Sequence, residues 1–411
     1  MTTASWVRLL EPLRQPAFRR AWLAAVLDGF GTGIERLAVG WFVLDATGSV
    51  FLTALSFAAR AAPNMVLGPL GGAIADRFER PRVLMTTVAA RSLLLLVVGG
   101  IVMAGMHSAW PLMGLIALTG VARASETPAM QAMIRDIVGA PRAPSAVSLH
   151  SLGVRSMAML GAFAGGVLLE RIDPGLVFLL AAGAVGVAAL TYSTMRVSRA
   201  ADGVAPVASA TAPTSVWRDA LDGLRIVLRI PVVVLLLLLA MGIEVFAFSF
   251  GSLMPGLAER VLHVDASGLG TLTFATGLGG VMGTAALSMF VHAVRRGPLL
   301  VVVMAVFAVS LVALSASEHF VLSLVLVVAI GAMAAMFDTL QWVLLQASVP
   351  DAVRGRVIGT WMTAIGFGWL GPVILGGMAA VFGVQWAIAT GGVMAGVLAC
   401  VALASAQLRR L

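Results

Sequence analysis

The sequence predicts an all-α membrane protein whose twelve transmembrane helices form two pseudo-symmetric six-helix bundles. Three observations support this prediction. Of the 411 residues, 60% are hydrophobic and only 11% are charged, too little charge to cover the surface of a soluble protein of this length. Twelve apolar runs are long enough to cross a bilayer, which takes about 20 residues. Arginine is concentrated in every second connection between these runs.

The predicted spans follow one another with short connections. In chain order they lie at 18–44, 50–75, 83–106, 109–134, 144–170, 174–195, 231–258, 266–291, 298–316, 319–346, 353–382 and 385–407. If both termini are cytoplasmic, twenty arginines lie on the cytoplasmic side and only Arg171 and Arg260 on the other. Because basic residues mark cytoplasmic loops, this asymmetry favours an even number of spans with both termini inside.

One polar segment, 196–230, divides the spans six and six. We therefore expect an N-terminal bundle at 1–195 and a C-terminal bundle at 231–411. The first part of the linker, 200–215, is rich in Ala, Pro, Ser and Thr, which is typical of a flexible connection. The second part, 215–225, alternates apolar and charged residues at helical spacing and predicts an amphipathic helix.

A charged loop between the second and third runs carries the most specific motif. The segment 72–82 reads Gly-Ala-Ile-Ala-Asp-Arg-Phe-Glu-Arg-Pro-Arg. This spacing resembles the signature loop between helices 2 and 3 of major facilitator superfamily transporters, although Glu79 stands at a usual Gly position and Pro81 at a usual basic one. The resemblance implies the major facilitator fold.

The two halves of the chain also resemble each other. The segment 130–136 follows the fourth run, the similar segment 345–351 follows the tenth, and a Gly-rich run comes after each. Such an internal repeat is expected of a duplicated six-helix unit. The segment 346–359 looks like the bacterial exporter branch of the superfamily, which includes siderophore exporters and macrolide or multidrug efflux pumps.

Ionisable residues inside the spans need a partner or a cavity, because each costs roughly 2.5–3.5 kcal/mol in the bilayer. Nine charges within the predicted spans stand out: Asp28, Glu35, Arg36, Arg60, Arg123, Glu126, Arg155, Glu244 and Asp338. Asp28 and Glu35 share one helical face. One interpretation is ion pairing that locks helices together, such as Asp28 with Arg60 or Glu126 with Arg155. The other is a polar central cavity with a protonatable acid, which the crowding of charges into the first half favours.

Such an acid can take up a proton on one side of the membrane and release it when an arginine approaches or substrate binds. By resemblance, exporters of this superfamily carry acids in helix 1 and an arginine in helix 4, where Arg123 stands. The predicted proton-coupling residues are Asp28, Glu35, Arg123, Glu126 and Glu244, with Arg36, Arg60 and Arg155 as ion-pair partners.

The resemblance also implies a cytoplasmic gate, in which Asp76 contacts the start of helix 11. A carboxylate at a helix N-terminus gains about 0.3–1 kcal/mol. The alternative is a plain surface loop, whose arginines only reflect the enrichment of basic residues on the cytoplasmic side. The predicted gating residues are Gly72, Asp76, Arg77, Arg80, Asp351 and Arg354. The predicted substrate-cavity residues are Asn64, Phe246 and Trp361.

The sequence has no phosphate-binding loop for ATP, no metal-ligand spacing among its five His and no Ser/His/Asp pattern, so we expect neither an enzyme nor a cofactor. We expect a secondary transporter that exports lipophilic or amphiphilic molecules such as drugs or siderophores by proton antiport. The alternatives are nutrient uptake, a lipid or lysolipid flippase, and a transporter-like receptor. The expected partners are a small-molecule substrate, protons and membrane lipids, without nucleic acid. We expect a monomer in the bacterial cytoplasmic membrane with both termini cytoplasmic.

Overall fold

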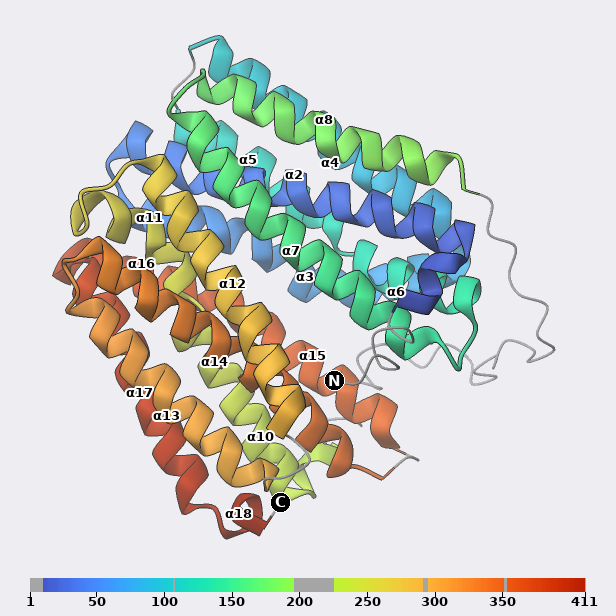
Figure 1. Ribbon diagram of the computed structural model, residues 1–411, viewed down its shortest axis with the longest axis vertical. Helices are drawn as coiled ribbons and strands as arrows, with labels where there is room; N and C mark the ends of the chain where they lie inside the picture. The colour runs from blue at the N-terminus through green and yellow to red at the C-terminus, as the bar shows by residue number, and fades with distance from the viewer. Residues whose placement is uncertain (1–9, 106–107, 196–224, 291–294, 351–352, 411) are drawn as a thin grey trace. The chain divides into compact units, whose positions relative to one another are not determined.

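The chain folds into helices joined by turns, which Figure 1 shows as two groups. The computed structural model describes residues 10–105, 108–195, 225–290, 295–350 and 353–410. Two compact units divide the chain: unit 1 is Met1–Ala201 with Ala258–Gly277, and unit 2 is Asp202–Leu257 with Leu278–Leu411. The predicted amphipathic helix at 215–225 lies almost wholly outside the described residues.

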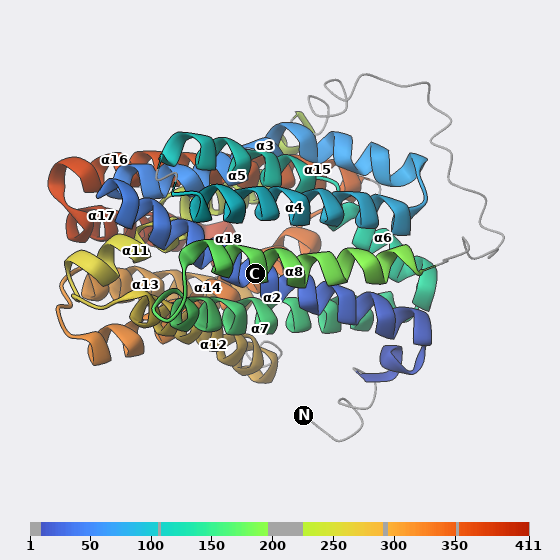
Figure 2. The same cartoon turned by 90° about the horizontal axis from the view of Figure 1, so that it is seen from above.

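Unit 1 is organised around its first long helix. Its helices are η1 (Glu11–Arg14), α2 (Pro16–Thr47), α3 (Val50–Arg77), α4 (Arg80–Met103), α5 (Ala109–Arg123), α6 (Glu126–Val138), α7 (Ala143–Leu169), α8 (Pro174–Ser193) and the first part of α12 (Ala266–Phe290). The helix α2 packs along both α7 and α8, α4 packs along α8, and α3 packs along α5. Figure 2 shows these helices running nearly side by side.

Glycine allows the close approach of α2 to its neighbours. A Cβ atom on Gly29 would come within 2.8 Å of the carbonyl oxygen of Val154 on α7, and one on Gly161 would meet the backbone of Phe30. Small residues at a helix interface let the backbones touch, which favours helix association in a membrane. Because α2 also carries charged residues, this packing brings those residues into the interior of unit 1.

Unit 2 contains the remaining helices. They are α10 (Pro231–Gly242), the π-helical turn η2 (Ile243–Ala247), α11 (Phe250–Arg260), the rest of α12, α13 (Arg296–Ser315), α14 (Phe320–Ala347), α15 (Arg354–Gly366), η4 (Phe367–Trp369), α16 (Leu370–Phe382), α17 (Val384–Ala404) and α18 (Ala406–Arg410). The helix α13 packs against both α14 and α17. The ring of Phe248 lies 5.9 Å from that of Phe307 and 6.3 Å from that of Phe337, so aromatic contacts fill this core.

Helices occupy every predicted span. In the described part of the chain, nine helical stretches are long and apolar enough to cross a membrane, and in two of them the helix is interrupted. The other three predicted spans, α2, α3 and the pair α5–α6, are also helical. The helix α2 carries several charged residues, and α5 and α6 are each shorter than a full span, at 15 and 13 residues.

The fourth predicted span is broken rather than continuous. The helix α5 ends at Arg123, and α6 begins at Glu126. Pro128 has no N–H to donate to the carbonyl oxygen of Ala124, so the helical hydrogen-bond ladder cannot continue through this point. A comparable interruption divides the seventh span, where η2 separates α10 from α11.

Candidate functional site

Charged side chains from α2, α3, α4 and the α5–α6 junction meet inside unit 1. We call this group the charge cluster; it consists of Asp28, Glu35, Arg36, Arg60, Arg91, Arg123 and Glu126, with the hydroxyl groups of Thr32 and Thr119. Asp28, Thr32, Glu35 and Arg36 all come from α2. Their spacing of three, four or seven residues places Asp28, Thr32 and Glu35 along one face of that helix.

Arg91 of α4 is the centre of the charge cluster, and its side chain is fully buried. Its Nη1 atom lies 2.8 Å from a carboxylate oxygen of Asp28 and 3.1 Å from one of Glu126. Its Nη2 atom lies 3.4 Å from Glu35 and donates a 2.8 Å hydrogen bond to the hydroxyl of Thr32. A buried ion is stable only if close counter-charges offset several kcal/mol of lost hydration. Three carboxylates meet that requirement for Arg91.

A second ion pair joins α2 to α3. The Nε atom of Arg60 donates to a carboxylate oxygen of Glu35 at 3.2 Å, and the Thr119 hydroxyl donates to the same oxygen at 3.3 Å. A Cβ atom on Gly120 would meet the backbone carbonyl of Arg60, so α5 packs directly on α3 at this level. Glu35 is therefore held from three helices, α3, α4 and α5.

The remaining two arginines of the charge cluster have fewer partners. Arg123 donates a 3.1 Å hydrogen bond to the hydroxyl of Thr32, the same oxygen that accepts from Arg91. Arg36 is exposed, whereas the α2 residues on either side of it are buried. The surface of unit 1 is therefore open at Arg36, although the charges around this side chain belong to the interior of the helix bundle.

The break between α5 and α6 positions Glu126. Because α6 starts at this residue, the Glu126 carboxylate lies in the first turn of a helix, where the helix dipole favours negative charge. A continuous helix would place Arg123 and Glu126 on the same face. Across the break, Arg123 contacts Thr32 and Glu126 contacts Arg91, which also donates to Thr32, so both residues still face the charge cluster.

The ion pairs differ from those the sequence suggested. Asp28 pairs with Arg91, not with Arg60, and Arg60 pairs with Glu35. Glu126 also pairs with Arg91, not with Arg155. Arg155 is exposed on α7 and makes no ion pair within the described chain. Spacing along one helix identifies the face that a charge occupies but leaves open which neighbouring helix supplies its partner.

Sequence reasoning missed Arg91, Thr32 and Thr119. A signal for Arg91 was available, because it is a lone arginine inside an apolar run, as Arg60 is. The two threonines gave no such signal, since a threonine in a membrane helix usually bonds to its own backbone. Thr119 does so as well, with a 2.8 Å bond to the carbonyl oxygen of Ile116.

Other predicted residues lie in unit 2. Glu244 is half-buried in the π-helical turn η2, close to Gly368 of η4, and within electrostatic reach of Asp338 on α14. Phe246 belongs to the same turn and is half-buried. The ring of Trp361 lies 5.0 Å from that of Trp342. Asn64, the third predicted cavity residue, belongs to unit 1 and is exposed on α3.

The predicted gating loop is described only in part. The side chains of Gly72, Asp76 and Arg354, and the whole of Asp351, lie outside the described residues. Arg77 is exposed at the end of α3. Arg80 forms an ion pair with Asp136 of α6 and donates a 3.4 Å hydrogen bond to the carbonyl oxygen of Ala132. The loop is therefore joined to the C-terminal end of α6.

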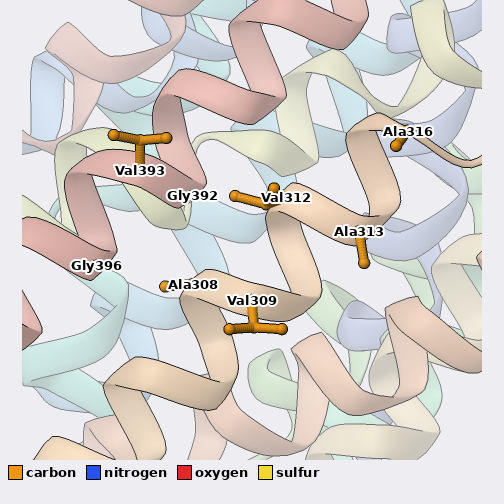
Figure 3. A pocket seen from close by; sticks show the side chains of 8 residues that line it. All are labelled: Ala308, Val309, Val312, Ala313, Ala316, Gly392, Val393 and Gly396. Carbon is orange, nitrogen blue, oxygen red and sulfur yellow. The ribbon is translucent and has the colours of Figure 1, made fainter.

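An apolar groove of about 470 Å³ runs between α13 and α17 of unit 2 (Figure 3). Its lining consists of Ala308, Val309, Val312, Ala313, Ala316, Gly392, Val393 and Gly396. None of these side chains carries a charge or a hydrogen-bonding group. The groove therefore offers no means of recognising a polar substrate, and the charge cluster is the better candidate site.

The fold defines the class of the protein. The nucleoside transporter NupG superposes on it with a TM-score of 0.71 over 94% of this chain and 98% of that chain, at 14% sequence identity. A D-xylose-proton symporter does so with a TM-score of 0.71, over 94% and 96% of the two chains, at 15% identity. The fold is thus that of major facilitator transporters.

The family follows from the sequence comparison. The family model described as transmembrane secretion effector (MFS_3) matches residues 7–411, and the chain belongs to this family. It is a multi-pass membrane transporter of the major facilitator superfamily and not an enzyme.

Two curated relatives cover most of the chain. The enterobactin exporter EntS of Escherichia coli O1:K1 / APEC is 26% identical over 390 residues, which are 92% of this chain and 89% of the relative. The staphyloferrin A transporter of Staphylococcus aureus strain NCTC 8325 is 24% identical over 360 residues, which are 86% and 87% of the two chains.

Proposed function

We propose that this protein exports a small amphiphilic molecule of the siderophore kind across the bacterial cytoplasmic membrane, and that inward proton movement drives the export. Membership of a family of secretion effectors supports outward transport. Two relatives bear the names of siderophore transporters, which supports the substrate class. The proposed state is a monomer with both termini in the cytoplasm. The proposed architecture is two six-helix halves, at 1–195 and 231–411, that expose the substrate site to each side of the membrane in turn.

The charge cluster is the observation that carries the proposal of proton coupling. Three carboxylates converge on one buried guanidinium, Arg91. A helix bundle that only needed to pack would lose stability by burying so many charges. Ionisable groups inside a membrane protein typically mark a transport or proton pathway.

Each acid of the charge cluster has a proposed role. Asp28, Glu35 and Glu126 each take up a proton from water when they lose contact with an arginine and release it to water when the contact re-forms, because an acid without a nearby arginine binds a proton more readily. Glu244 in unit 2 is a further proton carrier in this proposal. Arg80 and Asp136 hold the loop that gates the cytoplasmic side, where Asp76 and the start of α15 are the proposed contact.

Proton movement in proteoliposomes tests the proposal. The purified protein is reconstituted with a pH-sensitive dye inside, a pH gradient is imposed, and a panel of catecholate siderophores and lipophilic cations is added. We expect the substrate to trigger proton movement that is lost in Asp28→Asn and Glu126→Gln. The matched control is Asp45→Asn, since Asp45 is an exposed acid at the end of α2, outside the charge cluster.

Three outcomes are informative. Loss of coupling in the two cluster variants but not in the control supports the proposal. Substrate transport without proton movement contradicts proton coupling and favours facilitated export. Proton movement that survives in both cluster variants would show that other groups carry the proton.

A further inference from the structure

The positive and negative charges of the charge cluster are not evenly mixed. Arg91 has Asp28 and Glu126 as near neighbours, and Glu35 lies at its other end. The remaining arginines, Arg36, Arg60 and Arg123, lie close enough to one another for their charges to repel. Glu35 is the single carboxylate that acts on all three of them. We call these three arginines the basic side of the cluster.

Hydrogen bonding is also incomplete on the basic side. The Nη2 atom of Arg60 is buried and has no hydrogen-bond partner among the described residues. Arg123 contacts only a threonine hydroxyl, and Arg36 makes no hydrogen bond or ion pair within the described chain. A guanidinium has five N–H donors in a planar fork, so most of the donors on the basic side are unused. For the buried Nη2 group of Arg60, the lack of a partner is unfavourable unless a ligand supplies one.

We propose that Arg36, Arg60 and Arg123 bind an anionic group of the transported substrate: a carboxylate, a catecholate or a phosphate. Planar guanidinium groups bind such groups through two parallel charge-assisted hydrogen bonds. The proposal rests on the proposed export function and adds the charge class of the substrate. Arg36 is exposed and therefore open to an arriving anion, and the buried Nη2 of Arg60 has a donor to offer it.

Glu35 competes with the substrate for the same arginines. It is faced by Arg60 from α3, Arg91 from α4 and Arg123 from α5, as well as by Arg36 of its own helix. An arriving anion must displace Glu35 from Arg60, which costs less when Glu35 is protonated. Anion binding and protonation of Glu35 therefore favour each other. A proton exchanged against an anionic substrate consequently belongs to Asp28 or Glu126, around Arg91.

Binding of matched probes to the purified full-length protein tests the proposal. The anionic probe is 2,3-dihydroxybenzoate, and its uncharged match is 2,3-dihydroxybenzamide. Lysophosphatidylglycerol tests a lipid headgroup as the source of the anion. We measure dissociation constants by calorimetry for the unmodified protein and for Arg36→Gln, Arg123→Gln and Arg123→Lys. The control is Arg135→Gln, an exposed arginine on α6 outside the charge cluster.

We expect Arg36→Gln and Arg123→Gln to weaken binding of the anion at least tenfold, Arg123→Lys to weaken it less, and Arg135→Gln to leave it unchanged. A preference for the lysolipid over the benzoate, lost in the same variants, assigns the site to a lipid headgroup. Equal affinity for benzoate and benzamide, or no effect of the variants, overturns the proposal. Because Arg36 is exposed, its replacement should not disturb folding, and thermal unfolding checks this.

The outcome also separates this inference from the proposed function. If neutral or cationic molecules are exported with proton movement and the arginine variants have no effect, the function stands and the anion site is wrong. If the anion binds as expected but no substrate moves protons, the anion site stands and proton coupling is wrong.

Discussion

Arg91 has three carboxylate partners and no exposure to solvent, so its replacement should be among the most damaging in the chain. Arg91→Gln leaves a buried group of acids without their common counter-charge. Breaking a buried ion pair in this way costs about 3–5 kcal/mol of unfolding free energy. We expect a corresponding fall in the thermal unfolding temperature of the detergent-solubilised protein, followed by tryptophan fluorescence.

A charge-compensated variant serves as the control for Arg91. In Arg91→Gln/Glu126→Gln, one carboxylate is removed together with the guanidinium, so part of the lost stability should return. If the single variant is as stable as the unmodified protein, or if the double variant loses the sum of both effects, Arg91 does not balance these acids.

Sequence reasoning at the residue scale found the acids of the charge cluster but not their pairing. Asp28, Glu35 and Glu126 were recognisable because a charge in an apolar run is rare. Their ion-pair partners depend on how α3 and α4 pack against α2, and the residue pattern within one helix does not determine that packing. Arg155 also lies in an apolar run, so its place in the sequence suggested a buried ion-pair partner. The packing of α7 leaves it exposed instead.

Among the helices, the break between α5 and α6 has the most direct link to the charge cluster. Pro128→Ala restores an N–H group in the first turn of α6 and allows the helix to continue through residues 124 and 125. We expect a continuous helix to shift the Glu126 carboxylate from its present 3.1 Å contact with Arg91. We therefore expect substrate-driven proton movement in proteoliposomes to fall several-fold while the thermal unfolding temperature stays the same or rises.

Pro255 provides the control for this experiment, since it is a proline inside α11 and belongs to unit 2, whereas the charge cluster belongs to unit 1. Pro255→Ala should leave proton movement through the charge cluster unchanged. Equal proton movement in Pro128→Ala and the unmodified protein would mean that the break has no part in placing Glu126.

The N-terminus of α12 gives a prediction that depends on pH. The side chain of Asp265 accepts a 3.0 Å hydrogen bond from the backbone N–H of Gly268, and that of Glu170 accepts one of 2.8 Å from the N–H of Ser267. The hydrogen bond with Glu170, followed by that from Gly268, holds the pKa of Asp265 below its ordinary value of 3.8. Two carboxylates therefore cap one helix at the end of α7.

A lowered pKa means that the ionised form of Asp265 stabilises the fold. This contribution is complete above pH 3.8 and is lost as the pH falls through the lowered pKa of the folded protein. Asp265→Asn should therefore flatten the fall in unfolding temperature at acid pH and change little near neutrality, because Asn also caps helices well. The effect is small because Asp265 is largely solvated. An unchanged acid slope in the variant contradicts this assignment.

At the scale of the whole molecule, the sequence predicted the spans well because each apolar run must be about as long as the bilayer is thick. The helix α8, which is the sixth predicted span, begins at the predicted residue, and α7 begins one residue before the predicted 144. The break at residues 124–125 and the π-helical turn η2 were not predicted. The π-helical turn η2 lies in a mainly apolar run, so hydropathy does not reveal it, whereas Pro128 was a sequence signal for the break at residues 124–125.

Exchange of an anion for a proton would move net charge across the membrane, so export should depend on the membrane potential. The anion that we place on Arg36, Arg60 and Arg123 carries negative charge outward, and a proton exchanged for it carries positive charge inward. Both movements are favoured by an inside-negative potential, at about 2.3 kcal/mol per charge for each 100 mV. Export should therefore accelerate steeply when the potential is made inside-negative, and more steeply than movement of the anion alone would allow.

Proteoliposomes loaded with potassium and labelled 2,3-dihydroxybenzoate allow the potential to be set with valinomycin while efflux is followed. Efflux through the unmodified protein should rise with inside-negative potential, and a simultaneous record of internal pH should show protons entering. In Asp28→Asn the efflux rate should still rise with inside-negative potential, because the anion remains charged. The rise should be less steep, because no proton enters in exchange. In Arg36→Gln the anion should no longer be moved efficiently at any potential. Efflux that does not respond to the potential would mean that no net charge crosses with the substrate. The transported species would then be neutral, or one proton would leave with each anion.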